Sequence, residues 1–168
     1  ANGAKKLAIA VPADSADAAG AIAEGALLGA YTFNHYRSAS NSPARQSVKS
    51  IAVVCAEAKN AVVKSAVKRA VTVANATNAS RDLTNTSPLD LPPAKMAEAA
   101  AAIAEEHGLA IEVLDEKAMA KLGMGGILGV GQGSSRGPRL IRLAYRPAGA
   151  VGHLAIVGKG ITFDTGGI

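Results

Sequence analysis

Residues 5–33, KKLAIAVPADSADAAGAIAEGALLGAYTF, join a short apolar run to a longer stretch that is rich in alanine and glycine. The apolar run predicts a buried strand, and the longer stretch predicts a helix whose N-cap is Asp14 or Ser15. After a polar loop, residues 50–56, SIAVVCA, predict a second strand. A strand, a helix and another strand in this order are typical of an α/β layer, so we expect an α/β fold.

Two glycines of this predicted helix, Gly25 and Gly29, fall on the same face as Ile22 and Phe33. Because glycine carries no side chain, this face would let the helix lie very close to a sheet. Paired small residues also occur in membrane helices, but acidic side chains in this stretch argue against one. No apolar run is long enough to span a bilayer or to form a signal-peptide core, so we expect no membrane partner and a cytoplasmic location.

Residues 56–83 predict one long helix, because their apolar side chains recur at helical spacing. Three lysines, Lys59, Lys64 and Lys68, fall outside the apolar stripe and are expected to point away from the core. The stripe consists of Val63, Val67, Ala70 and Ala74.

The rest of the sequence alternates between predicted helices and strands. Pro92 and Pro93 suit the start of a helix that stops at Gly108, because proline favours the first helical positions and glycine the position after the last. The other expected elements are strands at residues 109–115, 139–146 and 153–158, and a short helix at residues 116–123.

The composition predicts a thin core. The chain has 168 residues, of which 3% are aromatic and none is tryptophan, so small side chains must fill its interior. The net charge is +5, but the basic residues are scattered without interleaved aromatics, and a nucleic-acid partner is therefore not expected. The single cysteine, Cys55, cannot form an internal disulfide, and its apolar surroundings predict a buried, inert thiol.

Three short motifs resemble known sites, but their spacing does not support them. Residues 126–135, GILGVGQGSS, lack the third glycine of a dinucleotide loop and follow a helix rather than a strand, which favours a close-packed connecting loop. Residues 158–160, GKG, lack the first glycine and the Ser or Thr of a phosphate loop. Residues 163–166, FDTG, match the short signature of aspartic peptidases, whose chemistry needs two such aspartates, and only one occurs here.

Residues 155–168, AIVGKGITFDTGGI, place Lys159 and Asp164 among glycines that allow the chain to turn. Aspartate is a hard oxygen ligand for divalent metals. A lysine amine can also coordinate a metal, if burial and a nearby cation favour loss of its proton. From the spacing alone both a metal site and a plain ion pair stay open, and the ion pair is the commoner arrangement.

The segment VGKGITFDTGGI resembles the first metal-binding segment of the cytosol (leucyl) aminopeptidase family. Two positions depart from the usual pattern of this family: Ser87 replaces a proline, and Leu89 replaces a polar residue. Neither position corresponds to a metal ligand. Three further stretches agree with the family in order and spacing, namely EGALLGAYTFNHYRS, ASRDLTNTSPLDLPP and GMGGILGVGQGSSRGPRLIRLAYR.

The resemblance implies an N-terminal α/β domain, a linker helix and a C-terminal α/β catalytic domain, usually assembled as a homo-hexamer. Residues 1–57 would then end the first domain, residues 58–80 would form the linker helix, and residues 81–168 would begin the catalytic domain. Compared with the family, the chain is expected to lack residues at both ends.

The resemblance also implies peptide substrates, whose first, leucine-like residue is released with the help of two divalent metal ions, zinc or manganese. Lys159 corresponds to a lysine ligand of one metal, and Asp164 to the aspartate that bridges both. The catalytic lysine and arginine of the family would lie beyond Ile168, so no catalytic residue is expected within this chain. We therefore expect the polypeptide alone to be inactive, unless a separate chain supplies the remainder of the enzyme.

Two other functions remain open from the sequence. An α/β module could hold a nucleotide-like ligand through its glycine loops without catalysis. Alternatively, the chain could be an interaction module that is stabilised by a partner, which exposed apolar edges around residues 1–12 and 151–168 would favour.

Overall fold

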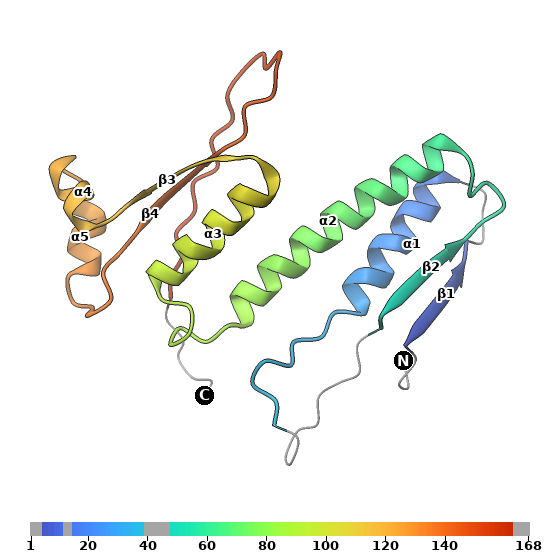
Figure 1. Ribbon diagram of the computed structural model, residues 1–168, viewed down its shortest axis with the longest axis horizontal. Helices are drawn as coiled ribbons and strands as arrows, with labels where there is room; N and C mark the ends of the chain where they lie inside the picture. Colours follow the sequence, from blue (N-terminus) through green and yellow to red (C-terminus); the bar gives the residue numbers. More distant parts are fainter. Residues whose placement is uncertain (1–4, 12–14, 39–47, 163–168) are drawn as a thin grey trace. The chain divides into compact units, whose positions relative to one another are not determined.

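The computed structural model describes residues 5–11, 15–38 and 48–162, and the chain divides into two compact units, Ala1–Thr86 and Ser87–Ile168 (Figure 1). Both units combine helices with strands, which confirms the predicted α/β class. None of the described helices is both long and apolar enough to cross a membrane.

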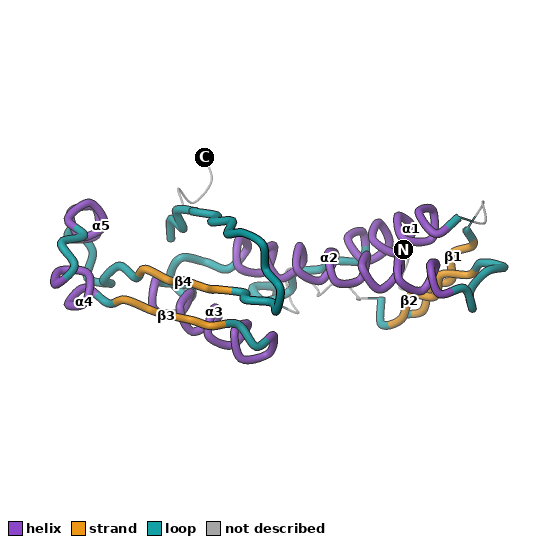
Figure 2. Tube along the Cα trace, turned by 90° about the horizontal axis from the view of Figure 1, so that it is seen from above, coloured by secondary structure: helices purple, strands orange, loops and turns teal. Residues whose placement is uncertain are grey.

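The first unit contains two parallel strands and two helices. Strands β1 (Lys6–Ala10) and β2 (Ser50–Val54) pair in parallel, with Leu7 opposite Ile51. Helices α1 (Ala16–Gly29) and α2 (Ala61–Asn85) lie side by side on one face of this strand pair (Figures 1 and 2). The strand–helix–strand order that the sequence predicts is therefore present.

Side-chain caps set where both helices of the first unit begin. The Ala18 amide donates to Ser15 Oγ at 3.0 Å, so Ser15 is the N-cap of α1, whereas Asp14 lies outside the described residues. The Val62 amide likewise donates to Asn60 Oδ1 at 2.8 Å, so α2 begins at Ala61 and residues 56–59 precede it. Such caps satisfy amide groups that have no partner within the helix.

Close packing of α1 involves a glycine other than the predicted pair. Gly25 and Gly29 are exposed, and a methyl group added at either would meet no atom within 4 Å, so the predicted close approach there is wrong. Instead Gly20 is buried against Ala66 of α2, where an added methyl carbon would lie 3.6 Å from the Ala66 Cβ. The reason is that α1 packs chiefly on α2, which turns the face of Ala19, Gly20 and Ala23 inward.

The apolar stripe predicted for α2 is confirmed, because Val63, Ala70 and Ala74 are buried while Lys64 and Lys68 are exposed. Alanine dominates the interior in general. Among the described residues, every buried apolar side chain other than Val63 and Met119 belongs to an alanine, as the composition predicts.

Polar contacts replace apolar packing near the end of α2. We call Tyr31, Arg81, Asp82 and Asn85 the Tyr31 latch. Tyr31 Oη donates to Asp82 Oδ1 at 2.7 Å and accepts from Asn85 Nδ2 at 3.1 Å. Arg81 stacks over the Tyr31 ring, 5.4 Å from its centroid, and donates to the Leu28 carbonyl at 3.0 Å. The latch therefore ties the chain after α1 to the last turns of α2.

The Tyr31 latch should make the stability of the chain fall at alkaline pH. Partial burial and the hydrogen bond to Asp82 raise the pKa of the Tyr31 phenol above its ordinary value of 10.0. Because the folded state then holds this proton more tightly than the unfolded state, the stabilisation is complete below about pH 10 and is lost as the pH rises through the raised pKa. Urea unfolding at several pH values should show a steeper alkaline decline for the wild type than for Tyr31→Phe. Tyr145→Phe, at an exposed tyrosine, serves as the control and should keep the wild-type decline.

The second unit packs one helix on an antiparallel strand pair. Helix α3 (Pro93–His107) begins and ends where its proline and Gly108 predict, and Gly108 has a φ of +64°. It lies against β3 (Ala110–Leu114) and β4 (Leu140–Ala144), which pair in antiparallel fashion (Figure 2). Among the described residues of this unit, those that are buried are Ala97, Ala100, Ala104 and Met119.

Two short helices connect β3 to β4. Helix α4 (Glu116–Lys121) begins where the predicted helix begins. Asp115 is its N-cap, because the Ala118 amide donates to Asp115 Oδ1 at 2.8 Å. Helix α5 (Gly125–Gly131) occupies much of the stretch for which the sequence predicts only a loop. The Leu128 amide donates to the Met124 carbonyl at 3.3 Å, so this glycine-rich segment closes a helical turn despite its low helix propensity.

Candidate metal-binding segment

The chain leaves β4 at Ala144 and turns at Gly149, whose φ of +77° suits glycine. Residues 150–162 then follow without helix or strand, so the strand predicted at residues 153–158 is wrong for this structure. Leu154, Ile156 and Val157 are each at least 89% exposed. A strand requires hydrogen bonds to a neighbouring strand, and within the described part of the chain β4 pairs only with β3.

Lys159 lies in this extended segment and is exposed. A methyl group added at Gly158 or Gly160 would meet no atom of the described residues within 4 Å, so these residues leave room around the lysine backbone. Asp164 falls outside the described residues. Its approach to Lys159 therefore stays a prediction, both as a shared metal site and as a plain ion pair.

The donor chemistry of the two predicted ligands fits part of a metal site. An amine nitrogen and a carboxylate oxygen are donors that zinc and manganese accept in proteins. Two donors do not complete a site for two ions, which needs several carboxylates. Within the described ranges, no cluster of three or more His, Cys, Asp or Glu side chains could hold a metal by itself.

The glycines of residues 131–137, here called the glycine loop, are explained in part by packing. A methyl group added at Gly131 would lie 2.6 Å from Pro138 Cγ, and one at Gly137 would collide with the Glu116 carboxylate. Glu116 Oε2 accepts from Arg139 at 2.7 Å, so Gly137 leaves room for an ion pair between α4 and the start of β4. A methyl group added at Gly126, Gly129 or Gly133 would meet nothing within 4 Å, so the prediction of a close-packed connecting loop is confirmed only in part.

The role of Arg136 is one that sequence reasoning missed. Its guanidinium donates to the Pro88 carbonyl at 3.1 Å and to the Leu89 carbonyl at 3.0 Å. It therefore ties the glycine loop to the first turn of the second unit. The signal in the sequence is the pair of arginines in SRGPR, residues 135–139, which flank the Gly137-Pro138 step at the end of the glycine loop.

The same turn explains one departure from the family pattern. The Leu89 amide donates to Ser87 Oγ at 3.3 Å, and the Asp90 amide donates to the Ser87 carbonyl at 2.9 Å. A serine hydroxyl can make such a turn-forming bond with a following amide. Ser87 thus stabilises the turn with a side-chain hydrogen bond.

Comparison with known proteins identifies two parts of one family along this chain. Residues 78–168 match the catalytic domain of the cytosol aminopeptidase family, and residues 1–40 match the N-terminal domain of the same family. The catalytic-domain match covers more than half of the chain and contains both Lys159 and Asp164.

Two relatives from Streptomyces are named as probable cytosol aminopeptidases. The Streptomyces griseus protein is 48% identical over 177 residues, and the Streptomyces avermitilis protein is 52% identical over 171 residues. Each comparison covers 99% of this chain but only 34% and 33% of the respective relative. The chain therefore spans about a third of the length of the relatives that it matches.

Solved structures of similar fold point to the same family. The bottromycin maturation enzyme BotP in complex with Mn has a TM-score of 0.74 and 31% identity, over 87% of this chain and 30% of its own. A mutant of tomato leucine aminopeptidase has a TM-score of 0.70 and 26% identity, over 82% of this chain and 28% of its own. With the catalytic-domain match over residues 78–168, these similarities show that the chain belongs to the cytosol aminopeptidase family.

Proposed function

We propose that this chain is part of a metal-dependent aminopeptidase that releases leucine-like N-terminal residues from peptides. The observation that carries the proposal is the catalytic-domain match over residues 78–168, since that range includes the predicted ligands Lys159 and Asp164. The proposed arrangement has residues 1–57 ending the N-terminal domain, residues 58–80 as the linker helix and residues 81–168 beginning the catalytic domain.

In this proposal the Lys159 amine would be a ligand of one divalent ion and the Asp164 carboxylate a ligand shared by two, which we take to be zinc or manganese. The similar enzyme BotP forms a complex with Mn, which supports a divalent metal for this family. When bound, such a metal pair would polarise the scissile carbonyl and activate a water molecule. The Lys159 amine must be neutral to donate its lone pair, so metal binding at this residue should release a proton.

The proposed partners and location follow the relatives. Peptides are the substrates that an aminopeptidase requires, and we propose a homo-hexamer in the cytoplasm as the working assembly. The remainder of the enzyme would come from the rest of a longer protein or from a separate chain. The relatives carry cytosol in their names, which supports the location.

The 168-residue polypeptide by itself should not release leucine from leucine p-nitroanilide, with either Mn²⁺ or Zn²⁺ present. The physical reason is that two donors cannot complete a site for two ions, which needs several carboxylates, and that Lys159 is exposed. The measurement is colour release together with the metal content of the desalted protein. Metal-dependent leucine release by the isolated chain would contradict this expectation, as would retention of two ions per chain.

An interaction module is the second candidate. The exposed apolar side chains of residues 151–161 favour it, because large exposed apolar patches often mark surfaces that bind another protein. The two candidates differ in a mixing experiment with the remaining two thirds of the Streptomyces griseus relative. Restored leucine release on mixing supports the aminopeptidase, whereas stable association without activity supports the interaction module.

A further inference from the structure

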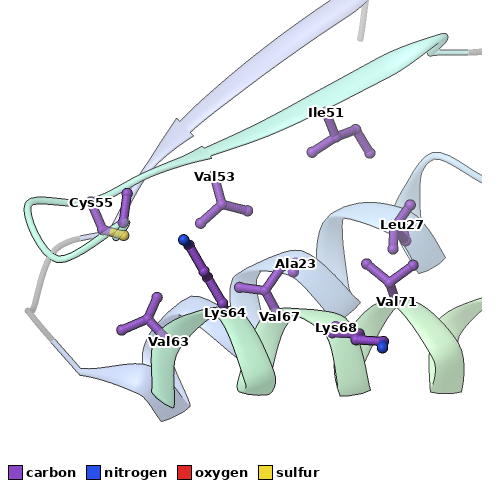
Figure 3. Close-up of a pocket in the computed structure, with 11 residues that line it drawn as sticks. Ala23, Leu27, Ile51, Val53, Cys55, Val63, Lys64, Val67, Lys68 and Val71 are labelled. Atoms are coloured by element: carbon purple, nitrogen blue, oxygen red, sulfur yellow. The ribbon is translucent and has the colours of Figure 1, made fainter. Parts of the chain in front are cut away.

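The first unit contains a cavity of about 380 Å³ between β2 and the two helices (Figure 3). Its walls are mostly apolar. They include Leu27 from α1, Ile51 and Val53 from β2, and Val67 and Val71 from α2. Cavities of roughly 300–1,000 Å³ with such walls are typical of small-molecule sites, and this one lies near the lower end of that range.

Two lysines give this cavity a positive charge. Lys64 and Lys68 of α2 line it, although the sequence predicts that both point away from the core. Figure 3 shows the Lys64 side chain rising from α2 toward Val53 of β2. Lys64 and Lys68 are one helical turn apart on α2, and both contribute to the wall of the cavity.

No anion among the lining residues balances this charge. The side chains that line the cavity include no Asp or Glu, and no ion pair to Lys64 or Lys68 is found within the described ranges. Apolar walls beside two uncompensated ammonium groups are complementary to a molecule with an alkyl tail and one anionic head. The anionic head would pair with the ammonium group of Lys64 or Lys68, and the tail would remove the valine and leucine side chains from water.

We propose that this cavity binds a medium-chain alkyl carboxylate. The volume favours a short tail over a long-chain lipid, and the lysines select an acid over an alcohol or an alkane. Cys55 also lines the cavity and adds soft apolar surface. This residue is half-buried, so the prediction of a buried thiol is wrong. The site lies in the first unit and uses neither Lys159 nor Asp164, so it is independent of the proposed aminopeptidase function.

Decanoate, kept below its micelle-forming concentration, is the probe for this site. Titration of the ¹⁵N-labelled chain should shift amide signals of β2 and α2 saturably, with one ligand bound per chain. Decanol shares the tail and should bind at least tenfold more weakly, and acetate shares the head and should give no saturable shift. Absence of saturable decanoate binding overturns the proposal, as does equal binding of decanol.

Variants test the two halves of the site separately. The double substitution Lys64→Gln and Lys68→Gln should weaken decanoate binding at least tenfold, whereas Lys59→Gln, at an exposed lysine that does not line the cavity, should leave it unchanged. Val67→Phe should fill the cavity and abolish binding, with circular dichroism verifying that the helices persist. If Val67→Phe does not fold, the double lysine variant alone tests the proposal, because substitutions of exposed lysines leave the core intact. Unchanged decanoate affinity in the double variant overturns the proposal.

Discussion

Replacing Asp164 by alanine is expected to lower kcat/KM for leucine p-nitroanilide by about a thousandfold in an active chimera. In this chimera the chain replaces the matching third of the Streptomyces avermitilis relative, with which it shares 52% identity. Loss of a partner that only supports a metal ligand costs about 10–100-fold, so loss of a bridging carboxylate should cost more. Lys159→Ala should act in the same direction and lower the metal content from two ions per chain.

Matched control variants distinguish the loss of a metal ligand from a general effect of substitution on folding or activity. Lys117→Ala removes an exposed lysine on α4, and Glu105→Ala removes an exposed carboxylate on α3, and both should keep activity and metal content. Full activity and two bound ions in Asp164→Ala would refute the proposed role of that residue. An inactive parent chimera would count against the proposed function itself.

Gly137→Ala is expected to destabilise the chain by about 1–3 kcal/mol, the usual cost of forcing extra volume into a packed site. The added methyl group would occupy the place of the Glu116 carboxylate and push it away from Arg139. The Arg139 side chain is only 24% exposed, so its guanidinium would lose a partner in a half-buried place. Urea unfolding monitored by circular dichroism gives the free energy of unfolding for both proteins.

Two further variants isolate the cause. Gly133→Ala lies in the same glycine loop, where an added methyl group meets nothing within 4 Å, and it should be close to neutral. In a Glu116→Ala background the collision is gone, so Gly137→Ala should cost less there than in the wild type. Equal destabilisation by Gly133→Ala and Gly137→Ala would show that loop stiffness, rather than the collision, is responsible.

Local signals predicted most helices and strands well, because their causes lie within a few residues. Ser15 provides the acceptor that starts α1, and Gly108 adopts the left-handed conformation that ends α3. The face that a helix buries depends instead on its neighbour. Gly25 and Gly29 were predicted to face a sheet, yet α1 packs on α2 through Gly20. Periodicity alone does not identify that neighbour.

The candidate site also combines features that neighbouring residues determine with features that depend on distant parts of the chain. The Lys159 and Asp164 spacing left a metal site and an ion pair open, and only the longer resemblance favoured the metal site. Lys64 and Lys68 fell outside the apolar stripe, so their position at a cavity depended on where β2 lies, which a helical pattern does not contain. The strand predicted at residues 153–158 failed for a related reason, since β propensity forms a strand only where a partner supplies hydrogen bonds.

The exposed apolar run from Val151 to Val157 has a consequence for the colloidal behaviour of the chain. Residues 150–158, AVGHLAIVG, contain no Asp, Glu, Lys, Arg or Pro, so no charge repulsion or backbone block opposes stacking of identical segments. Exposed segments with high β propensity, little charge and no proline are aggregation hazards, because identical segments of different molecules can pair. We therefore expect self-association through residues 150–158 to compete with the binding of these residues to any partner. Higher protein concentration should favour aggregation.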